Sequence, residues 1–109
     1  MANQSPIFIR VETFMVWLFS HTAKFPKNER FRLAKRIDDA LFDFHAHLVD
    51  ATQHETKYHL KQADKQLNLL RAYLRIAVEL GYTTSKQYQH ASEHTSELGK
   101  LLGGWLKKA

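Results

Sequence analysis

The chain has seven histidines, and their spacing can be compared with that of the metal sites found in other proteins. Cysteine is absent, so a transition-metal site would need imidazole and carboxylate ligands. His90 and His94 are four residues apart and Glu97 follows one turn later, so on a helix all three would share a face that can chelate a metal. However, the sequence has no HExxH motif and none of the inward Glu-x-x-His pairs of di-iron bundles. We therefore predict no metal and no cofactor.

The other histidines are interpreted as ordinary helix residues. His45 and His47 would point to different faces of one helix. Asp43 and Asp50 each precede a histidine by four residues, as surface pairs on helices do. His45 lies beside an apolar stripe, so we expect it at the edge of the core, bonded to its surroundings. No Ser/His/Asp arrangement and no phosphate-binding glycine loop is found, and the paired acids Asp38 and Asp39 would point to different faces. We therefore predict that the protein is not an enzyme.

Basic residues repeat at helical spacing between residues 57 and 75. Six polar positions keep spacings of three and four and form a polar stripe beside the apolar one: Lys57, Lys61, Asp64, Asn68, Arg71 and Arg75. Four of the six are cationic, and a stripe of this kind can follow the phosphates of a nucleic acid. The alternative is a solvated face whose last arginines favour the helix C-terminus.

A second basic group lies at the start of a helix that we predict over residues 27–50. Its members, with only Glu29 among them, are Lys27, Arg30, Arg32, Lys35 and Arg36. Cations at a helix N-terminus oppose the helix dipole, and each lowers the stability of the helix by about 0.3 kcal/mol or more. An external anion would explain a pattern that costs stability.

Glycines recur near the C-terminus, where Gly99 and Gly103 are four residues apart and Trp105 follows. A glycine inside a helix costs about 1 kcal/mol relative to alanine. Close approach of another helix is one reason to keep these glycines, and we predict that the three residues contact another subunit. Fraying at the chain end is the alternative.

The length and charge of the chain indicate a single basic domain over residues 1–109. The net charge is +5 and the isoelectric point is near 9.6, which favours nucleic acid or an acidic partner. Arg10 and Glu12 interrupt the N-terminal stretch, so we expect no signal peptide. The uncharged run over residues 13–23 is too short to cross a bilayer, so we predict a cytoplasmic protein with no membrane partner.

Four amphipathic helices must position these residues. They are predicted at residues 6–23, at residues 27–50, from a capping box of Thr52 and Glu55 to a left-handed cap at Gly81, and onward from a capping box of Thr84 and Gln87. Their apolar seams are Ile7, Val11, Phe14 and Leu18; Ala34, Ile37, Leu41, Phe44, Leu48 and Ala51; Leu60, Ala63, Leu67, Leu70, Leu74 and Ala77; and Tyr88, Ala91, Thr95, Leu98, Leu102 and Trp105. Short connections between long helices predict an all-α, antiparallel up-down four-helix bundle. The first helix is apolar over so broad a face that we expect it to contact two neighbours or another subunit.

The segments Leu70-Arg71-Ala72-Tyr73-Leu74-Arg75 and Leu98-Gly99-Lys100-Leu101-Leu102-Gly103-Gly104-Trp105-Leu106 resemble those of the accessory variability determinants (Avd) of diversity-generating retroelements. These belong to a broader group of four-helix bundles, which includes proteins encoded by intervening sequences in bacterial ribosomal RNA genes. The resemblance implies a homopentameric ring that binds a reverse transcriptase and RNA or DNA during mutagenic retrohoming. By position, Arg71 and Arg75 match the paired arginines of the family's third helix. The alternative is a ribosomal-RNA-associated or purely structural bundle without a polymerase partner.

Overall fold

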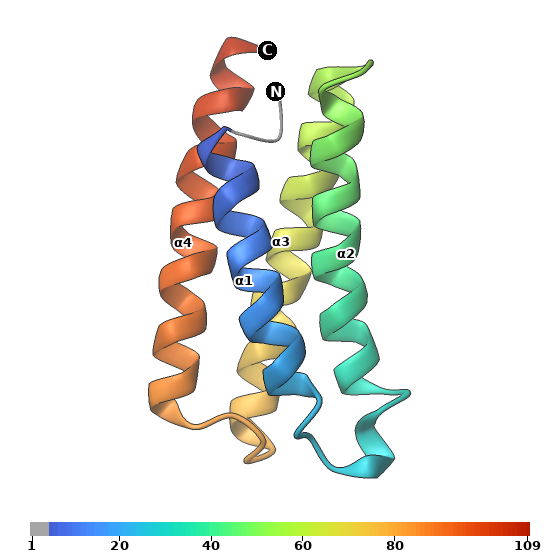
Figure 1. The fold of residues 1–109 in the computed structure, drawn as a ribbon, viewed down its shortest axis with the longest axis vertical. Helices are drawn as coiled ribbons and strands as arrows, with labels where there is room; N and C mark the ends of the chain where they lie inside the picture. The colour runs from blue at the N-terminus through green and yellow to red at the C-terminus, as the bar shows by residue number, and fades with distance from the viewer. Residues whose placement is uncertain (1–4) are drawn as a thin grey trace.

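The computed structural model describes residues 5–109, and these form four long helices that run alternately up and down (Figure 1). The helices are α1 (Pro6–Thr22), α2 (Leu33–Ala51), α3 (Thr56–Glu79) and α4 (Ser85–Lys108), with a short 3-10 turn, η2 (Lys27–Glu29), before α2. Each long helix packs against its neighbours in sequence, and α1 packs against α4 to close the bundle. The predicted all-α, antiparallel four-helix bundle is confirmed, whereas the ring stays a prediction. None of the described helices is long and apolar enough to cross a membrane.

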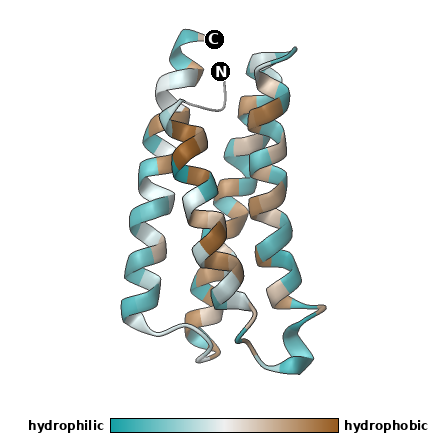
Figure 2. Cartoon of the chain, in the orientation of Figure 1, coloured by the Kyte–Doolittle hydropathy of each residue, from teal (hydrophilic) through white to brown (hydrophobic). Residues whose placement is uncertain are grey.

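The core lies along the axis of a body of 40 × 24 × 22 Å. Every predicted seam residue of α1, α2 and α3 is buried, and so are four of the six seam residues of α4. The other two, Tyr88 and Trp105, are half-buried and pack against the same core. Figure 2 shows the hydrophobic residues concentrated along α1 and α2, while the turns of α4 are mostly hydrophilic.

Two helix ends follow the predicted local chemistry. Thr84 and Gln87 form a reciprocal capping box at the start of α4. Gly81 has a φ of 81°, and the backbone N–H groups of Gly81 and Tyr82 bond to the carbonyls of Val78 and Ala77. This is the Schellman arrangement, in which glycine takes a left-handed conformation without steric cost.

The predicted start of the second helix is wrong. Residues 27–29 form a separate 3-10 turn, and α2 begins only at Leu33 after Arg32, whose φ and ψ of −116° and −104° are not helical. The break coincides with a tertiary contact, because Glu29 is buried and bonds to Tyr82, 53 residues further along the chain.

The predicted capping box at the start of the third helix is also wrong. Thr52 instead ends α2, where its hydroxyl donates to the carbonyl of Val49. Glu55 precedes α3 with a φ of 45° and makes no side-chain cap. The hydroxyl of Thr56 donates to the carbonyl of Ala51 and ties the two helices together across the turn.

Candidate nucleic-acid and partner interface

The polar stripe of α3 lies on the outer side of the bundle. Five of its six members are exposed, and Arg71 is half-buried. Lys57 and Arg75 are 18 residues apart, so at the rise of an α-helix the stripe extends for about 27 Å. In the described part of the chain, neither Arg71 nor Arg75 forms an ion pair with Asp64 or Glu79. The stripe therefore presents its positive charge outward.

Arg71 differs from the rest of the stripe because its guanidinium group is used inside the bundle. Its Nη1 donates to Asn68 Oδ1 and its Nη2 donates to the backbone carbonyl of Thr95 on α4, each at 3.0 Å. Gly99 lies one turn after Thr95, and a Cβ atom there would come within 2.8 Å of Arg71 Nη2. The absence of a side chain at Gly99 thus opens the Thr95 carbonyl to Arg71, and the arginine links α3 to α4.

The basic group before and within the start of α2 is partly neutralised. Arg32 forms a two-point ion pair with Glu29, and Lys35 pairs with Asp39 one turn on. Lys27, Arg30 and Arg36 are exposed, and no ion pair is recorded for them within residues 5–109. These three cations are the ones with no recorded acidic partner in that range, while anion binding by all five residues stays a prediction.

Glu29 organises this end of the bundle. Its side chain is 1% exposed and accepts bonds from Arg32 Nε and Nη2 and from the hydroxyl of Tyr82. The bonds from Arg32, followed by the bond from Tyr82, lower the pKa of the Glu29 carboxyl to about 2. The carboxylate thereby joins the α1–α2 connection to the α3–α4 connection.

The structure adds one residue that the sequence analysis missed. Phe31 lies between Arg30 and Arg32, outside any helix, and its side chain is 80% exposed. An exposed aromatic ring between cations can stack on a base while the cations approach the phosphates. The sequence signal was an aromatic residue flanked by two arginines, hidden by the assumption that a helix continued through it.

The two basic surfaces lie apart. Lys57 and Lys61 are in the first turns of α3, at the end of the bundle where α2 finishes, whereas residues 27–36 lie at the opposite end (Figure 1). Arg75, in the last turns of α3, lies towards the same end as residues 27–36. The bond from Arg71 to Thr95 places the stripe on the α3–α4 side.

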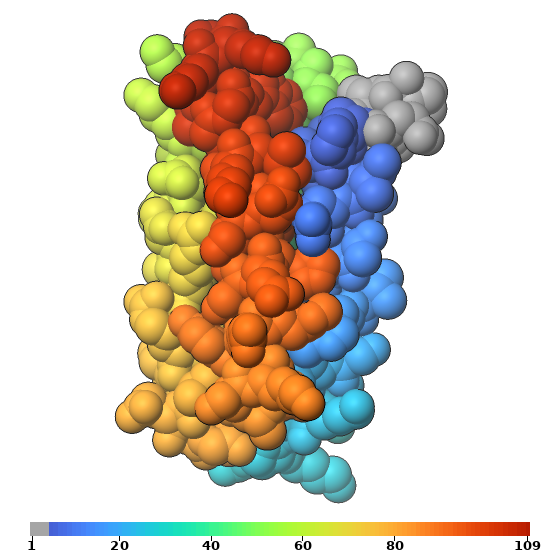
Figure 3. Space-filling view, turned by 90° about the vertical axis from the view of Figure 1, so that its left-hand side faces the viewer, coloured from blue at the N-terminus to red at the C-terminus, as the bar shows by residue number. Residues whose placement is uncertain are grey.

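The predicted contact residues of α4 have different surroundings. Figure 3 shows α4 across one face of the molecule, between α3 and α1. Gly99 faces Arg71, as described, whereas a Cβ atom at Gly103 would have open space around it. Trp105 is half-buried, with its ring 6.4 Å from that of Phe8, and lines a hollow with Pro6 and Leu101. The contact of Gly99, Gly103 and Trp105 with another subunit stays a prediction.

His90 and His94, the pair considered for a metal, pack against aromatic rings of α1. His94 is buried with its ring parallel to that of Phe14 at 4.8 Å, and His90 packs on Trp17 at 4.7 Å. Burial, and then the neighbouring His90, lower the pKa of His94, so the ring is neutral at physiological pH. His45, expected at the core edge, is half-buried, and its Nε2 lies 3.1 Å from Glu12 Oε2.

Comparison with known proteins gives a match that covers almost the whole chain. A family model described as bAvd-like matches residues 7–109, which include α2, α3, α4 and all of α1 except its first residue. No curated protein matches the chain. The family match confirms the resemblance that the segments of α3 and α4 carried.

Proposed function

This chain belongs to the bAvd-like family, and we propose that it is a cytoplasmic, non-catalytic accessory protein of a diversity-generating retroelement. In this role it binds the element's reverse transcriptase and nucleic acid and supports mutagenic retrohoming. The observation that carries the proposal is the family match over residues 7–109, because it includes the helices and both segments on which the resemblance rests.

The polar stripe of α3 supports the nucleic-acid part of the proposal. Its exposed lysines and Arg75 lie along about 27 Å of helix, a length over which several phosphates of one strand can be contacted. Such contacts release counterions and read no sequence. Phe31 beside Arg30 offers a second contact, in which a base stacks on the ring.

A charge-matched comparison tests this part. The variant Lys57→Ala/Lys61→Ala removes two charges from the stripe, and Lys107→Ala/Lys108→Ala removes two from the end of α4. For a single-stranded RNA or DNA probe, we expect the stripe variant to reduce the slope of log affinity against log salt by between about one and two, because each lost phosphate contact lowers it. We expect the α4 variant to keep the wild-type slope. Equal effects of the two variants would show that total charge matters and the stripe does not.

Arg75 is the arginine that we assign to the reverse transcriptase. It is exposed, it has no partner among the described ion pairs and hydrogen bonds, and its planar guanidinium can hold a carboxylate at two points. Arg71 contributes to the same surface while it holds α4. We expect Arg75→Ala to weaken co-purification of the reverse transcriptase, and Arg75→Lys to restore it only in part.

Co-purification also separates this proposal from the alternative. Wild-type protein that fails to retain the reverse transcriptase of its own retroelement, yet retains ribosomal RNA, would support the ribosomal-RNA-associated bundle. A polymerase retained equally by wild-type and Arg75→Ala protein would remove Arg75 from the contact and leave the accessory role standing.

A further inference from the structure

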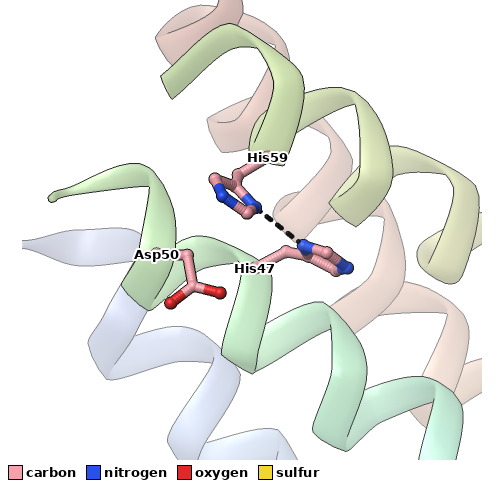
Figure 4. Close-up of side chains that lie close together, drawn as sticks. All are labelled: His47, Asp50 and His59. Carbon is pink, nitrogen blue, oxygen red and sulfur yellow. Dashed lines mark hydrogen bonds between the residues drawn. The ribbon is translucent and has the colours of Figure 1, made fainter. Parts of the chain in front are cut away.

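Three ligand-capable side chains lie close together at the turn between α2 and α3. His47 and Asp50 lie three residues apart in α2, on one face of the helix, and His59 lies in the first turn of α3 (Figure 4). One nitrogen or oxygen from each lies within 4.8 Å of the others. Four of the seven histidines of the chain fall between residues 45 and 59, which is the sequence signal for this cluster.

The two imidazoles meet through the same type of nitrogen. His47 Nδ1 and His59 Nδ1 are 3.0 Å apart, so in the hydrogen bond between them one ring donates from Nδ1 and the other accepts at Nδ1. Tetrahedral Zn²⁺ binds imidazole nitrogen at about 2.0–2.1 Å, which sets two such nitrogens about 3.3 Å apart. The observed separation is within a few tenths of an ångström of that spacing. A metal ion bound to both nitrogens would lie to the side of the line that joins them, so the rings must turn for both Nδ1 lone pairs to point at it. The more exposed ring, that of His47, has room for this movement.

The surroundings supply a third ligand and fix one of the rings. His59 is 91% buried, so its ring is held by packing, while His47 and Asp50 are half-buried and open to ion entry. His54 and Glu55 form a second group with His59 within the same limit of 4.8 Å. The neighbourhood thus contains further nitrogen and oxygen donors near the same buried ring.

We propose that this cluster binds a divalent transition-metal ion of the Zn²⁺ type, through His47 Nδ1, His59 Nδ1 and the carboxylate of Asp50. Two imidazoles and one carboxylate suit Zn²⁺, Co²⁺ or Ni²⁺ better than Mg²⁺ or Ca²⁺, which prefer oxygen ligands. The ring that donates at Nδ1 must move its proton to Nε2, so that both Nδ1 lone pairs face the ion.

The bound ion would link α2 to α3, because its ligands come from both helices. The turn that joins them contains neither glycine nor proline, and its Glu55 has a left-handed backbone, which is unfavourable for a residue with a side chain. A ligand that binds only the folded state stabilises it in proportion to the logarithm of its concentration over Kd. The site is separate from His90 and His94, on which the sequence prediction of no metal was based.

Calorimetric titration of tag-free protein with Zn²⁺ tests the proposal. We expect one ion per protomer, and a Tm that rises by about 5 °C or more at saturating Zn²⁺. Asp50→Asn and His47→Ala should weaken binding at least tenfold and abolish the Tm rise. His90→Ala, a matched control with a histidine removed elsewhere, should bind as the wild type does. Co²⁺ should give a visible absorption spectrum that His47→Ala protein lacks.

Either of two results would overturn the proposal. One is no binding by the wild type at 100-fold molar excess of Zn²⁺. The other is binding by Asp50→Asn and His47→Ala with wild-type affinity. Both substitutions are at half-buried positions, and circular dichroism of the variants without metal verifies that the helices are retained. His59 is left unchanged in these variants because its burial makes folding depend on it.

Discussion

At the scale of single residues, Arg71 and Arg75 lie one turn apart on α3 and have different surroundings. Arg71 donates to the Thr95 carbonyl on α4, whereas Arg75 is exposed. We expect Arg71→Ala to lower the free energy of unfolding by about 1 kcal/mol, because the carbonyl of buried Thr95 loses a charged donor. Arg75→Ala should change it by less than about 0.5 kcal/mol. Urea denaturation of the two variants measures the difference.

This difference decides how a partner-binding experiment on the arginine pair is interpreted. A loss of binding in Arg71→Ala protein combines a surface effect with a weaker α3–α4 contact. Arg75→Ala separates the two, since it changes the surface and leaves the contact in place. Equal destabilisation by both substitutions would contradict the role assigned to the Arg71–Thr95 bond.

Glu29 makes stability depend on pH in the acid range. Its carboxyl has a pKa of about 2 in the folded protein, below the ordinary value of 4.5, because Arg32 and Tyr82 bond to the charged form. A lowered pKa means that this stabilisation is complete above pH 4.5 and is lost as the pH falls towards 2. We expect Glu29→Gln to have a lower Tm than the wild type at pH 6, and the gap to narrow steadily between pH 4.5 and pH 2. Thermal melts at several pH values would contradict the prediction if the gap stayed constant.

At the scale of helices, Gly99 and Arg71 act as one contact between α3 and α4. Gly99→Ala gains about 1 kcal/mol of helix propensity but displaces the Arg71 guanidinium, so the net change in stability should be small. In an Arg71→Ala background the clash is gone, and the same substitution should stabilise by about 1 kcal/mol. A double-mutant cycle by urea denaturation measures this coupling.

Gly103→Ala is the matched control for that cycle, because open space surrounds the position. It should stabilise the protomer by a similar amount in both backgrounds. A Gly99→Ala effect that is the same with and without Arg71 would show that the two residues are independent.

Sequence reasoning located the helices well where their signals are local. Seams at spacings of three and four gave the core of α2 and α3, and neighbouring residues decide the Thr84 capping box and the Gly81 cap. The start of α2 depends on the bond between Glu29 and Tyr82, which are 53 residues apart. No local pattern carries that information.

The same reason limited prediction of the sites. The stripe of α3 is a property of one helix, so its exposed cations could be identified from spacing. The link from Arg71 to Thr95 and the contact between His47 and His59 join different helices. Their residues are brought together by packing, and helical spacing within one segment could not reveal them.

At the scale of the whole molecule, apolar residues remain exposed on the outer surface of α1 and α2. Ile9 and Val16 of α1 are seven residues apart, as are Phe42 and Val49 of α2, and all four are at least 41% exposed. The two pairs lie on the same side, because Phe19 stacks on Phe42 and Glu12 meets His45 between the helices. Apolar residues gathered in this way are typical of a surface that another protein covers.

We expect this α1–α2 surface to form contacts between subunits of a homo-oligomer. Light scattering of the wild type at micromolar concentration should then give a mass several times 12.8 kDa, and five times this value if the ring implied by the family resemblance forms. Val16→Glu or Phe42→Glu would bury a charge without a partner at each contact, which lowers the stability of the contact by about 3 kcal/mol or more. Either variant should shift the mass towards the protomer.

Two further variants locate the contact. Ile76→Glu, at an exposed apolar position of α3, is the matched control and should leave the mass unchanged. Gly103→Leu tests the contact predicted for α4, where open space around the residue leaves room for another subunit. If Gly103→Leu lowers the mass and Val16→Glu does not, the subunits meet through α4. A wild-type mass of 12.8 kDa would exclude assembly through either surface, and the exposed residues of α1 and α2 would then be available to a different protein.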